Sequence, residues 1–373
     1  MKIAFWAATV FVFYAYVGYA LWLWVLSRIH PWPLLRGAYL PFVSVVMIVR
    51  DEENALPKKL ANLSALKYPP DRIEWVVVSD GSKDATEQIL SNAARDSRFR
   101  VLTFSESKGK AARLNDAVTI ARGDIVFFAD ARQEIEPDAL RLLMENFVEG
   151  NVGCASGELM LGQPGSGEAE KGMGIYWRVE KKIRELESAS GSVVGATGAI
   201  YAARRALLVA LPEGTILDDV FLPLHIARQG SRVVFDDRAR AWDTPDLGSG
   251  REFRRKVRTL TGNYQLLQIA PWLLGNENPL RFRFISHKLL RLLSPFALLM
   301  MLITTAFISQ AFYRMAFFAQ VFFYALSLLT LVQVQLGPVA RIANAVLSLI
   351  VLNTAAVVAC AKFLTGRKEV WAR

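Results

Sequence analysis

Charged side chains stand where short apolar runs end in the middle of the chain. These positions are Arg50, Glu52, Asp80, Asp130 and Arg132. A carboxylate accepts hydrogen bonds from hydroxyl and N–H groups or ligates a cation, whereas an arginine guanidinium binds phosphate. A single Asp at such a turn is usually a helix cap, but acidic sites at the ends of three separate runs predict a ligand-binding edge.

The apolar runs are typical of strands buried on both faces of a parallel sheet, because they are short and continuous. They cover residues 42–49, 75–80, 100–104 and 124–130. Helix-like segments separate them, and one of these opens with Asp84 and Glu87 as a capping pair. The alternation predicts a doubly wound α/β domain over residues 38–270, with ligands beyond the carboxyl ends of its strands.

The N-terminal residues 1–29 predict an uncleaved transmembrane anchor. Ile3–Leu26 carries no charge and is longer than the apolar region of a signal peptide. Arg28 and Arg36 follow this segment, whereas Lys2 alone precedes it. The positive-inside rule therefore predicts a cytoplasmic location for the domain that follows.

The C-terminal part predicts about three further membrane helices, over residues 294–364. Residues 280–293 interleave basic and apolar side chains, which favours an amphipathic helix in the membrane interface, with a basic flank of the next span as the alternative. Three spans would leave the basic tail, residues 365–373, outside the cell. Either one segment is re-entrant or the tail charge is tolerated, so the side of the tail stays open.

Composition narrows the functional classes. The net charge of +10 favours attraction to anionic lipids and phosphorylated substrates. Nucleic acid is not an expected partner, because the basic residues border membrane segments and no nucleic-acid-binding motif is present. Cys154 and Cys360 are too few for a disulfide framework, which agrees with a reducing compartment.

An ordered set of motifs over residues 41–270 resembles the family 2 glycosyltransferases of the integral-membrane branch that makes exopolysaccharides and glycolipids. The motifs are "SVVMIVRDEENAL", "EWVVVSDGSKDAT", "KGKAARLNDA", "GDIVFFADAR", "GATGAIYAARR", "ILDDVFLPLHIARQGSRVVF" and "EFRRKVRTLTGNYQ". The resemblance implies a GT-A fold, a mixed α/β sheet flanked by transmembrane helices. It also implies a multi-pass protein of the inner or plasma membrane.

The resemblance assigns a set of residues to a nucleotide-sugar donor, which it implies to be a UDP-sugar. They are Arg50, Glu52 and Asp80 at the uridine, Lys110 near the phosphates, Asp130 and Arg132 in the Asp-x-Asp motif, and Arg258 at the diphosphate. Asp80 could instead be only a turn-forming residue, and Lys110 an ordinary solvated lysine. Arg258 has a further alternative, a basic helix that faces lipid headgroups.

Asp219 matches the catalytic base of the family, which removes the proton of the acceptor hydroxyl. Asp218 stands beside it, and the acceptor-side loop contains Gly195, Thr197 and Gly198. A neighbouring negative charge raises the pKa of a carboxylate, which suits a base. The alternative is a helix N-terminus made acidic to complement the helix dipole.

The metal site implied by the resemblance is altered, because Arg132 replaces the second acid of the Asp-x-Asp motif. Asp130 is then the one expected protein ligand. Mg²⁺ or Mn²⁺ accepts diphosphate and water oxygens for its other positions, so a weak metal dependence is expected. Alternatively, Arg132 neutralises the diphosphate and the metal is dispensable.

Taken together, the expected function is that of a membrane-bound inverting glycosyltransferase with a lipid-linked or polysaccharide acceptor. Thr259 stands where processive synthases have a Trp that contacts the acceptor sugar, which favours a non-processive enzyme. The alternatives are a processive polysaccharide synthase and a catalytically silent membrane subunit that binds a nucleotide sugar.

Overall fold

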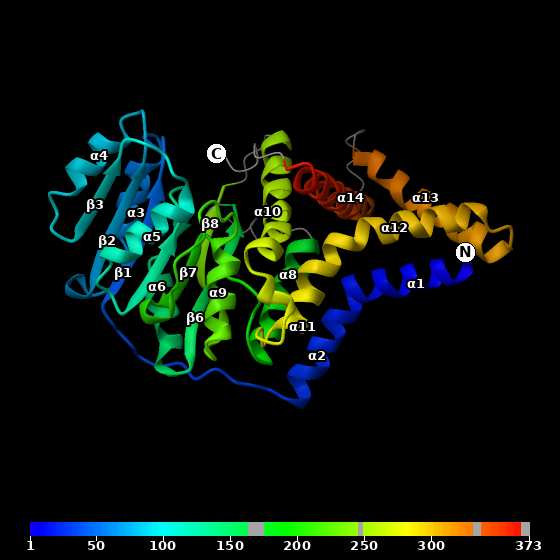
Figure 1. The fold of residues 1–373 in the computed structure, drawn as a ribbon, viewed down its shortest axis with the longest axis horizontal. Helices are drawn as coiled ribbons and strands as arrows, with labels where there is room; N and C mark the ends of the chain where they lie inside the picture. The colour runs from blue at the N-terminus through cyan, green and yellow to red at the C-terminus, as the bar shows by residue number, and fades with distance from the viewer. Residues whose placement is uncertain (163–174, 245–248, 331–336, 367–373) are drawn as a thin grey trace.

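The computed structural model describes residues 1–162, 175–244, 249–330 and 337–366, and these form an α/β domain at one end of a helical extension (Figure 1). Within the described residues the domain contains an eight-stranded sheet in the order β3-β2-β1-β4-β7-β6-β8-β5. The strands are β1 Val43–Val49, β2 Ile73–Asp80, β3 Phe99–Phe104, β4 Ile125–Ala129, β5 Glu134–Ile135, β6 Val152–Leu161, β7 Ile200–Arg204 and β8 Arg232–Asp243. The four strands expected from the sequence are present, with ends that differ by one or two residues.

The sheet is mixed, as the resemblance implies. Strands β3, β2, β1 and β4 are parallel, β7 is antiparallel to both β4 and β6, and β8 is parallel to β6. Consecutive side chains of a strand point to opposite faces. Val46 and Val76 therefore join one core cluster, and Val45 and Val77 join the other.

Helices cover both faces of the sheet. Those of the first face are α5 Lys110–Ile120, α9 Asp218–Arg228 and α10 Ser249–Ile269, and those of the second are α3 Leu56–Ser64, α4 Thr86–Ala93 and α6 Ala139–Met144. The helix α8 Ile175–Ala189 packs beside β8. The short helical turns of the domain are η2 Pro70–Arg72, η3 Glu145–Val148, η4 Arg205–Leu207 and η5 Pro271–Leu274. The expected capping pair is wrong in part. Asp84 accepts a hydrogen bond from the Thr86 amide, but Glu87 accepts one from the Ser79 hydroxyl.

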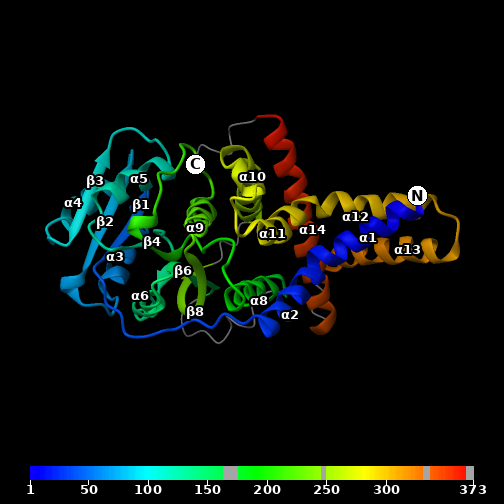
Figure 2. The same ribbon diagram turned by 60° about the horizontal axis from the view of Figure 1, so that its bottom comes forward.

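Four helical runs of the described residues are long and apolar enough to cross a membrane. They are α1 Lys2–Phe13 with η1 Tyr14–Gly18 and α2 Tyr19–Ile29; α11 Arg281–Phe284 with η6 Ile285–Leu289 and α12 Leu290–Phe307; α13 Ala311–Leu326 with η7 Ser327–Thr330; and α14 Gly337–Leu364. In both views α1, α12 and α13 extend away from the sheet together, and α14 runs across α12 (Figures 1 and 2).

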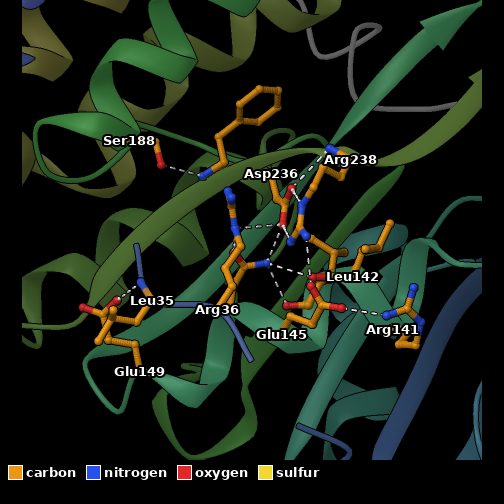
Figure 3. Close-up of polar contacts among 12 residues, drawn as sticks. Leu35, Arg36, Arg141, Leu142, Glu145, Glu149, Ser188, Asp236 and Arg238 are labelled. Carbon is orange, nitrogen blue, oxygen red and sulfur yellow. Dashed lines mark hydrogen bonds and ion pairs between the residues drawn. The ribbon is translucent and has the colours of Figure 1, made fainter. Parts of the chain in front are cut away.

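The first membrane helix is tied to the α/β domain through residues 30–42. The Leu35 amide donates to the Glu149 carboxylate at 3.1 Å, and the Arg36 guanidinium lies 3.5 Å from Asp236 (Figure 3). Burial on its own raises the pKa of Asp236, but bonds from Arg238 and other neighbours hold it below the ordinary value. Arg36 therefore packs onto the α/β domain.

A buried polar cluster joins the membrane helices to α8. The His287 ring lies between Glu180 and Glu187, at 3.0 and 2.9 Å, and the Tyr19 hydroxyl donates to Glu187 at 2.6 Å. Arg283 is also buried, with three backbone carbonyls as acceptors. Residues 280–293, expected to lie in the interface, thus begin a longer helical run whose polar side chains face α8.

Candidate active site

A cavity of about 540 Å³ lies between the carboxyl ends of β1 and β4, the N-terminus of α9, and the helices α8 and α10. Its lining includes most of the expected site residues: Glu52, Lys110, Asp130, Arg132, Thr197, Gly198, Asp218, Asp219 and Arg258. Arg50, Asp80 and Gly195 are not part of the lining. The topology therefore gathers side chains that are far apart in the sequence around one space.

Asp80 holds a loop beside the cavity. Its buried carboxylate accepts hydrogen bonds from the Ser107 hydroxyl, the Lys108 and Gly109 amides, and the Arg113 Nε, all between 2.7 and 2.9 Å. Burial raises the pKa of Asp80, but these bonds outweigh it and hold the pKa below its ordinary value. A carboxylate with four donors has little capacity left for uridine, so this geometry favours the turn-forming role.

Arg50 lies next to the same loop. Its Nη1 donates to the Ser107 hydroxyl at 3.1 Å, and this hydroxyl donates to Asp80. The side chain is exposed, and its role at the uridine stays a prediction. Gly81 has a positive φ of 70°, and a Cβ there would lie 2.8 Å from the Ser107 nitrogen, so only glycine fits this turn.

Other acidic residues at the ends of β1 and β2 accept hydrogen bonds from the loops there. The Asp51 carboxylate accepts from the Lys83 amide at 2.7 Å, and Glu53 accepts from the Ala85 amide at 3.0 Å. These bonds fasten the two strand-end loops to each other. Of the acidic run after β1, Glu52 faces the cavity.

Lys110 connects the two acidic sides of the cavity. It is the first residue of α5, and its Nζ lies 3.0 Å from Asp130 and 3.6 Å from Asp218. Burial on its own lowers the pKa of Lys110, but Asp130, Asp218 and Asp219 raise it above its ordinary value. Lys110 is therefore a fixed positive charge between the Asp-x-Asp position and the expected base.

The altered Asp-x-Asp position forms an ion pair in place of a carboxylate pair. The Arg132 guanidinium lies 3.0 Å from Glu52, and its side chain is 72% exposed. Among the residues the structure describes, no three His, Cys, Asp or Glu side chains are grouped to hold a metal ion. Asp130 offers one carboxylate as a metal ligand, and this carboxylate also forms an ion pair with Lys110. These donors suit only a cation whose other ligands come from the substrate.

Asp219 lies at the N-terminus of α9, next to the acceptor-side loop. Its pKa is raised to about 6, first by burial and then by the charge of Asp218, whereas Lys110 lowers it. The Ala196 amide donates to the Asp219 carbonyl at 2.7 Å. A Cβ on Gly198 would lie 3.0 Å from the Asp219 Oδ2, so glycine lets the loop approach this carboxylate.

The rest of this loop is held by the sheet and by α8. The Thr197 amide and hydroxyl bond to Ser156 and Gly157, and Arg184 donates to the Thr197 hydroxyl at 2.8 Å. Gly195 packs against α9, because a Cβ there would lie 3.1 Å from Val220. Thr197 thus positions the loop and Arg184 together.

The site residues expected from the sequence do not include the wall that α8 provides. Its cavity-lining residues are Trp177, Glu180, Lys181 and Arg184. Their spacing of three and four residues is the signal that one helix face carries them, but an amphipathic helix usually packs one face on the core and exposes the other. The partner strand β6 adds Glu158, which is buried and lies 2.9 Å from Lys181.

The roof of the cavity comes from α10, with Arg255, Arg258 and Thr259. This helix is fastened to the segment before α9, since Gln265 accepts from the Ile216 amide at 3.0 Å. A Cβ on Gly262 would lie 2.6 Å from Leu217, so the two elements touch closely. The position of α10 is therefore linked to that of Asp218 and Asp219.

Comparisons with known proteins point to one family of enzymes. The model of the family "Glycosyl transferase family 2" matches residues 44–210. A poly-beta-1,6-N-acetyl-D-glucosamine synthase of Staphylococcus aureus is 22% identical over 236 residues, which are 60% of this chain and 55% of that protein. A beta-monoglucosyldiacylglycerol synthase of Trichormus variabilis is 26% identical over 204 residues, 52% of this chain and 44% of that protein. The chain thus spans about half the length of the curated relatives it matches.

Among solved structures, a mannosyltransferase from Pyrobaculum calidifontis in complex with GDP-Man and Mn²⁺ aligns with a TM-score of 0.72. The alignment covers 98% of this chain and 99% of that chain, at 21% identity. At this identity the likeness concerns the fold, and it extends over the helical extension as well as the α/β domain. Residues 44–210 therefore match glycosyl transferase family 2, and the fold of the chain is of the GT-A type.

Proposed function

We propose that the chain is a membrane-bound, non-processive glycosyltransferase that moves a sugar from a UDP-linked donor to a membrane-associated acceptor, with inversion. One observation carries the proposal. The expected base Asp219 and the cations Lys110, Arg132 and Arg258 line a single cavity, at the end of the domain that joins the membrane helices. This arrangement supports a reaction in which a base removes the proton of the acceptor hydroxyl and cations stabilise the charged leaving group.

In the proposed reaction the Asp219 carboxylate accepts the proton of the acceptor hydroxyl. The acceptor oxygen then forms a bond to the anomeric carbon, while the bond from that carbon to the diphosphate oxygen breaks. Attack opposite to the leaving group inverts the configuration. The raised pKa of Asp219, about 6, supports this role, because a carboxylate nearer neutrality is a stronger base and is still ionised at pH 7.

The leaving diphosphate gains negative charge as its bond to the sugar breaks. Lys110, Arg132 and Arg258 are proposed to stabilise this charge, as preorganised cations do in a low-dielectric site. A divalent metal, held by Asp130 and the diphosphate, would add further charge neutralisation there. Because one protein carboxylate is available, we propose weak metal dependence.

The acceptor is proposed to enter between α8 and α10, where Trp177, Arg184 and Thr259 line the cavity. One of the two relatives is a polysaccharide synthase and the other is a glycolipid synthase, which supports a glycan or lipid acceptor. Trp177 is an aromatic side chain of the cavity wall that α8 provides. We propose that the α/β domain lies in the cytoplasm, next to the inner or plasma membrane.

The test is release of UDP by purified full-length protein with a panel of UDP- and GDP-linked sugars and a membrane lipid extract. We expect turnover with a UDP-sugar, a fall of 100-fold or more in Asp219→Asn, about the loss typical of a missing general base, and little change in Asp71→Asn. Asp71 is an exposed aspartate in η2, before β2 and so at the other end of the sheet. Equal release by parent and Asp219→Asn would refute the assignment of the base.

The products separate the proposal from its alternatives. Single-sugar addition with inverted configuration, read by mass spectrometry and NMR, is expected. Long polymers would favour the processive alternative; the Staphylococcus aureus relative is a synthase of such a polymer. Tight nucleotide binding with no turnover of any sugar would favour a catalytically silent subunit.

A further inference from the structure

Both ends of α14 lie at the domain end of the helical extension. Gln320 of α13 donates to the Leu298 carbonyl of α12, so α13 runs back along α12 after the turn at residues 308–310. At that turn Trp6 donates to the Tyr313 hydroxyl at 3.3 Å, so the N-terminus of α1 is at the same far end. Figure 2 shows α14 crossing this bundle near the start of α12, with neither end at the far turn.

The C-terminal half of α14 packs on α10. Ala355 and Ala359 are buried against Val257, and Phe363 stacks on Tyr264 with ring centroids 5.6 Å apart. The first half of α10 is highly charged and carries Arg251, Glu252, Arg254, Arg255, Lys256 and Arg258. Such a density of charge does not enter the hydrocarbon core of a bilayer. The part of α14 beside it therefore lies outside that core.

The remaining part of α14 is too short to cross. From Gly337 to Asn353 an α-helix rises roughly 24 Å, whereas the hydrocarbon core is roughly 30 Å thick. The side chain of Asn353 also exchanges hydrogen bonds with the hydroxyl of Tyr16, at 3.1 and 3.3 Å. Tyrosines of membrane helices are enriched at the water–lipid boundary, which agrees with a position of α14 near that boundary.

Large apolar side chains are nevertheless exposed from Ile342 to Leu364, among the smaller polar residues Asn344, Ser348 and Thr354. Ile342 is 53% exposed, Leu347 38%, Val357 42% and Leu364 77%. A helix that cannot cross the bilayer, but exposes large apolar side chains, is stable in the zone between headgroups and acyl chains. We propose that α14 lies flat in the leaflet that faces the α/β domain, and that the chain crosses the membrane three times, through the helical runs Lys2–Ile29, Arg281–Phe307 and Ala311–Thr330.

This placement accounts for the topology that the sequence leaves open. With three crossings Leu364 is on the same side as the α/β domain, and Arg367 and Lys368 follow it in the sequence, in accordance with the positive-inside rule. It also gives α10 two partners. One face of α10 roofs the cavity and the other rests on α14, so the cavity is held at the membrane surface where a lipid-borne acceptor arrives.

The first experiment is cysteine labelling of full-length protein in its native membrane with an impermeant maleimide, in a Cys360→Ala background that leaves only the buried Cys154. Ile342→Cys and Leu364→Cys mark the two ends of α14. Asn92→Cys, on the exposed surface of α4, reports the domain side, and Gln310→Cys reports the far turn. We expect both α14 positions to label with Asn92→Cys. Labelling of Leu364→Cys together with Gln310→Cys would overturn the proposal.

The second experiment measures depth, and it does not depend on reagent access to the ends of the helix. Nitroxide labels at Ile342, Val357 and Leu364 are compared through their collision rates with oxygen and with a water-soluble nickel complex. We expect similar depths near the headgroups. A helix that crosses the bilayer would instead separate Ile342 from Val357 by roughly 22 Å of depth. Neither experiment uses activity, so failure of the proposed function would leave this inference intact.

Discussion

The charge on Asp218 is predicted to set the pH dependence of the enzyme through Asp219. The pKa of Asp219 is raised to about 6, by burial and then by Asp218. A base works when it is ionised, so activity rises as pH increases through this value. With a pKa of about 6, roughly one-tenth of the molecules are ionised at pH 5 and roughly nine-tenths at pH 7. The rate ratio between pH 7 and pH 5 is therefore expected to be about 10.

Asp218→Asn keeps the shape of the side chain and removes its charge. Removing one neighbouring carboxylate charge, partly screened by its surroundings, is expected to lower the pKa of Asp219 by about one unit. A pKa near 5 would leave roughly half of the molecules ionised at pH 5, and the ratio between pH 7 and pH 5 would fall to about 2. Lys110→Met removes a charge that lowers the pKa of Asp219, so its acid limb should move to higher pH.

The assay is kcat/KM for UDP release between pH 4.5 and 9 at constant ionic strength, which reports groups of the free enzyme. Asp130→Asn is the graded control, because Asp130 raises the pKa of Asp219 less than Asp218 does. The order of the acid limbs is then expected to be Asp218→Asn lowest, Asp130→Asn next, the parent above both, and Lys110→Met highest. An active Asp218→Asn variant whose acid limb coincides with that of the parent would refute the reasoning.

Three further perturbations test other parts of the site. Asp80→Asn removes the partner of the buried Arg113 and should lower the free energy of unfolding by about 3 kcal/mol, measured by thermal denaturation in detergent. A change in donor KM with no change in stability would contradict this structural role. Because the pKa of Asp80 is lowered on folding, its contribution to stability is present above its unfolded pKa and is lost as pH falls. Trp177→Ala should raise the acceptor KM about tenfold with little effect on the donor KM, and Trp177→Phe should bring the acceptor KM most of the way back. An unchanged acceptor KM in Trp177→Ala would show that the indole only packs on Trp242. Excess chelator should reduce activity only in part, and full activity in chelator would show that Arg132 and Lys110 suffice at the diphosphate.

Much of the parallel half of the fold is predictable from local pattern. Strands β1 to β4 are continuous apolar runs, and their pairing follows from the alternation with helices. The antiparallel strand β7 and the short β5 are not predictable in this way, because their partners are set by contacts across the sheet. The role of α8 is hidden for the same reason, since amphipathic spacing identifies a face but not what that face meets.

The sequence by itself determined the strands of the parallel half with the helices between them, where the polar turns stand and which segments are apolar enough for a bilayer. These properties depend on residues within a few positions of each other. Only the tertiary structure decided that Asp80 is closed off by a loop, that Lys110 connects Asp130 to Asp218, and that Arg132 binds Glu52. It also placed α14 across the helical bundle, against α10. Length and hydropathy describe α14 as a crossing helix, but the charged helix beside it, almost 100 positions earlier in the chain, sets the depth at which it can lie.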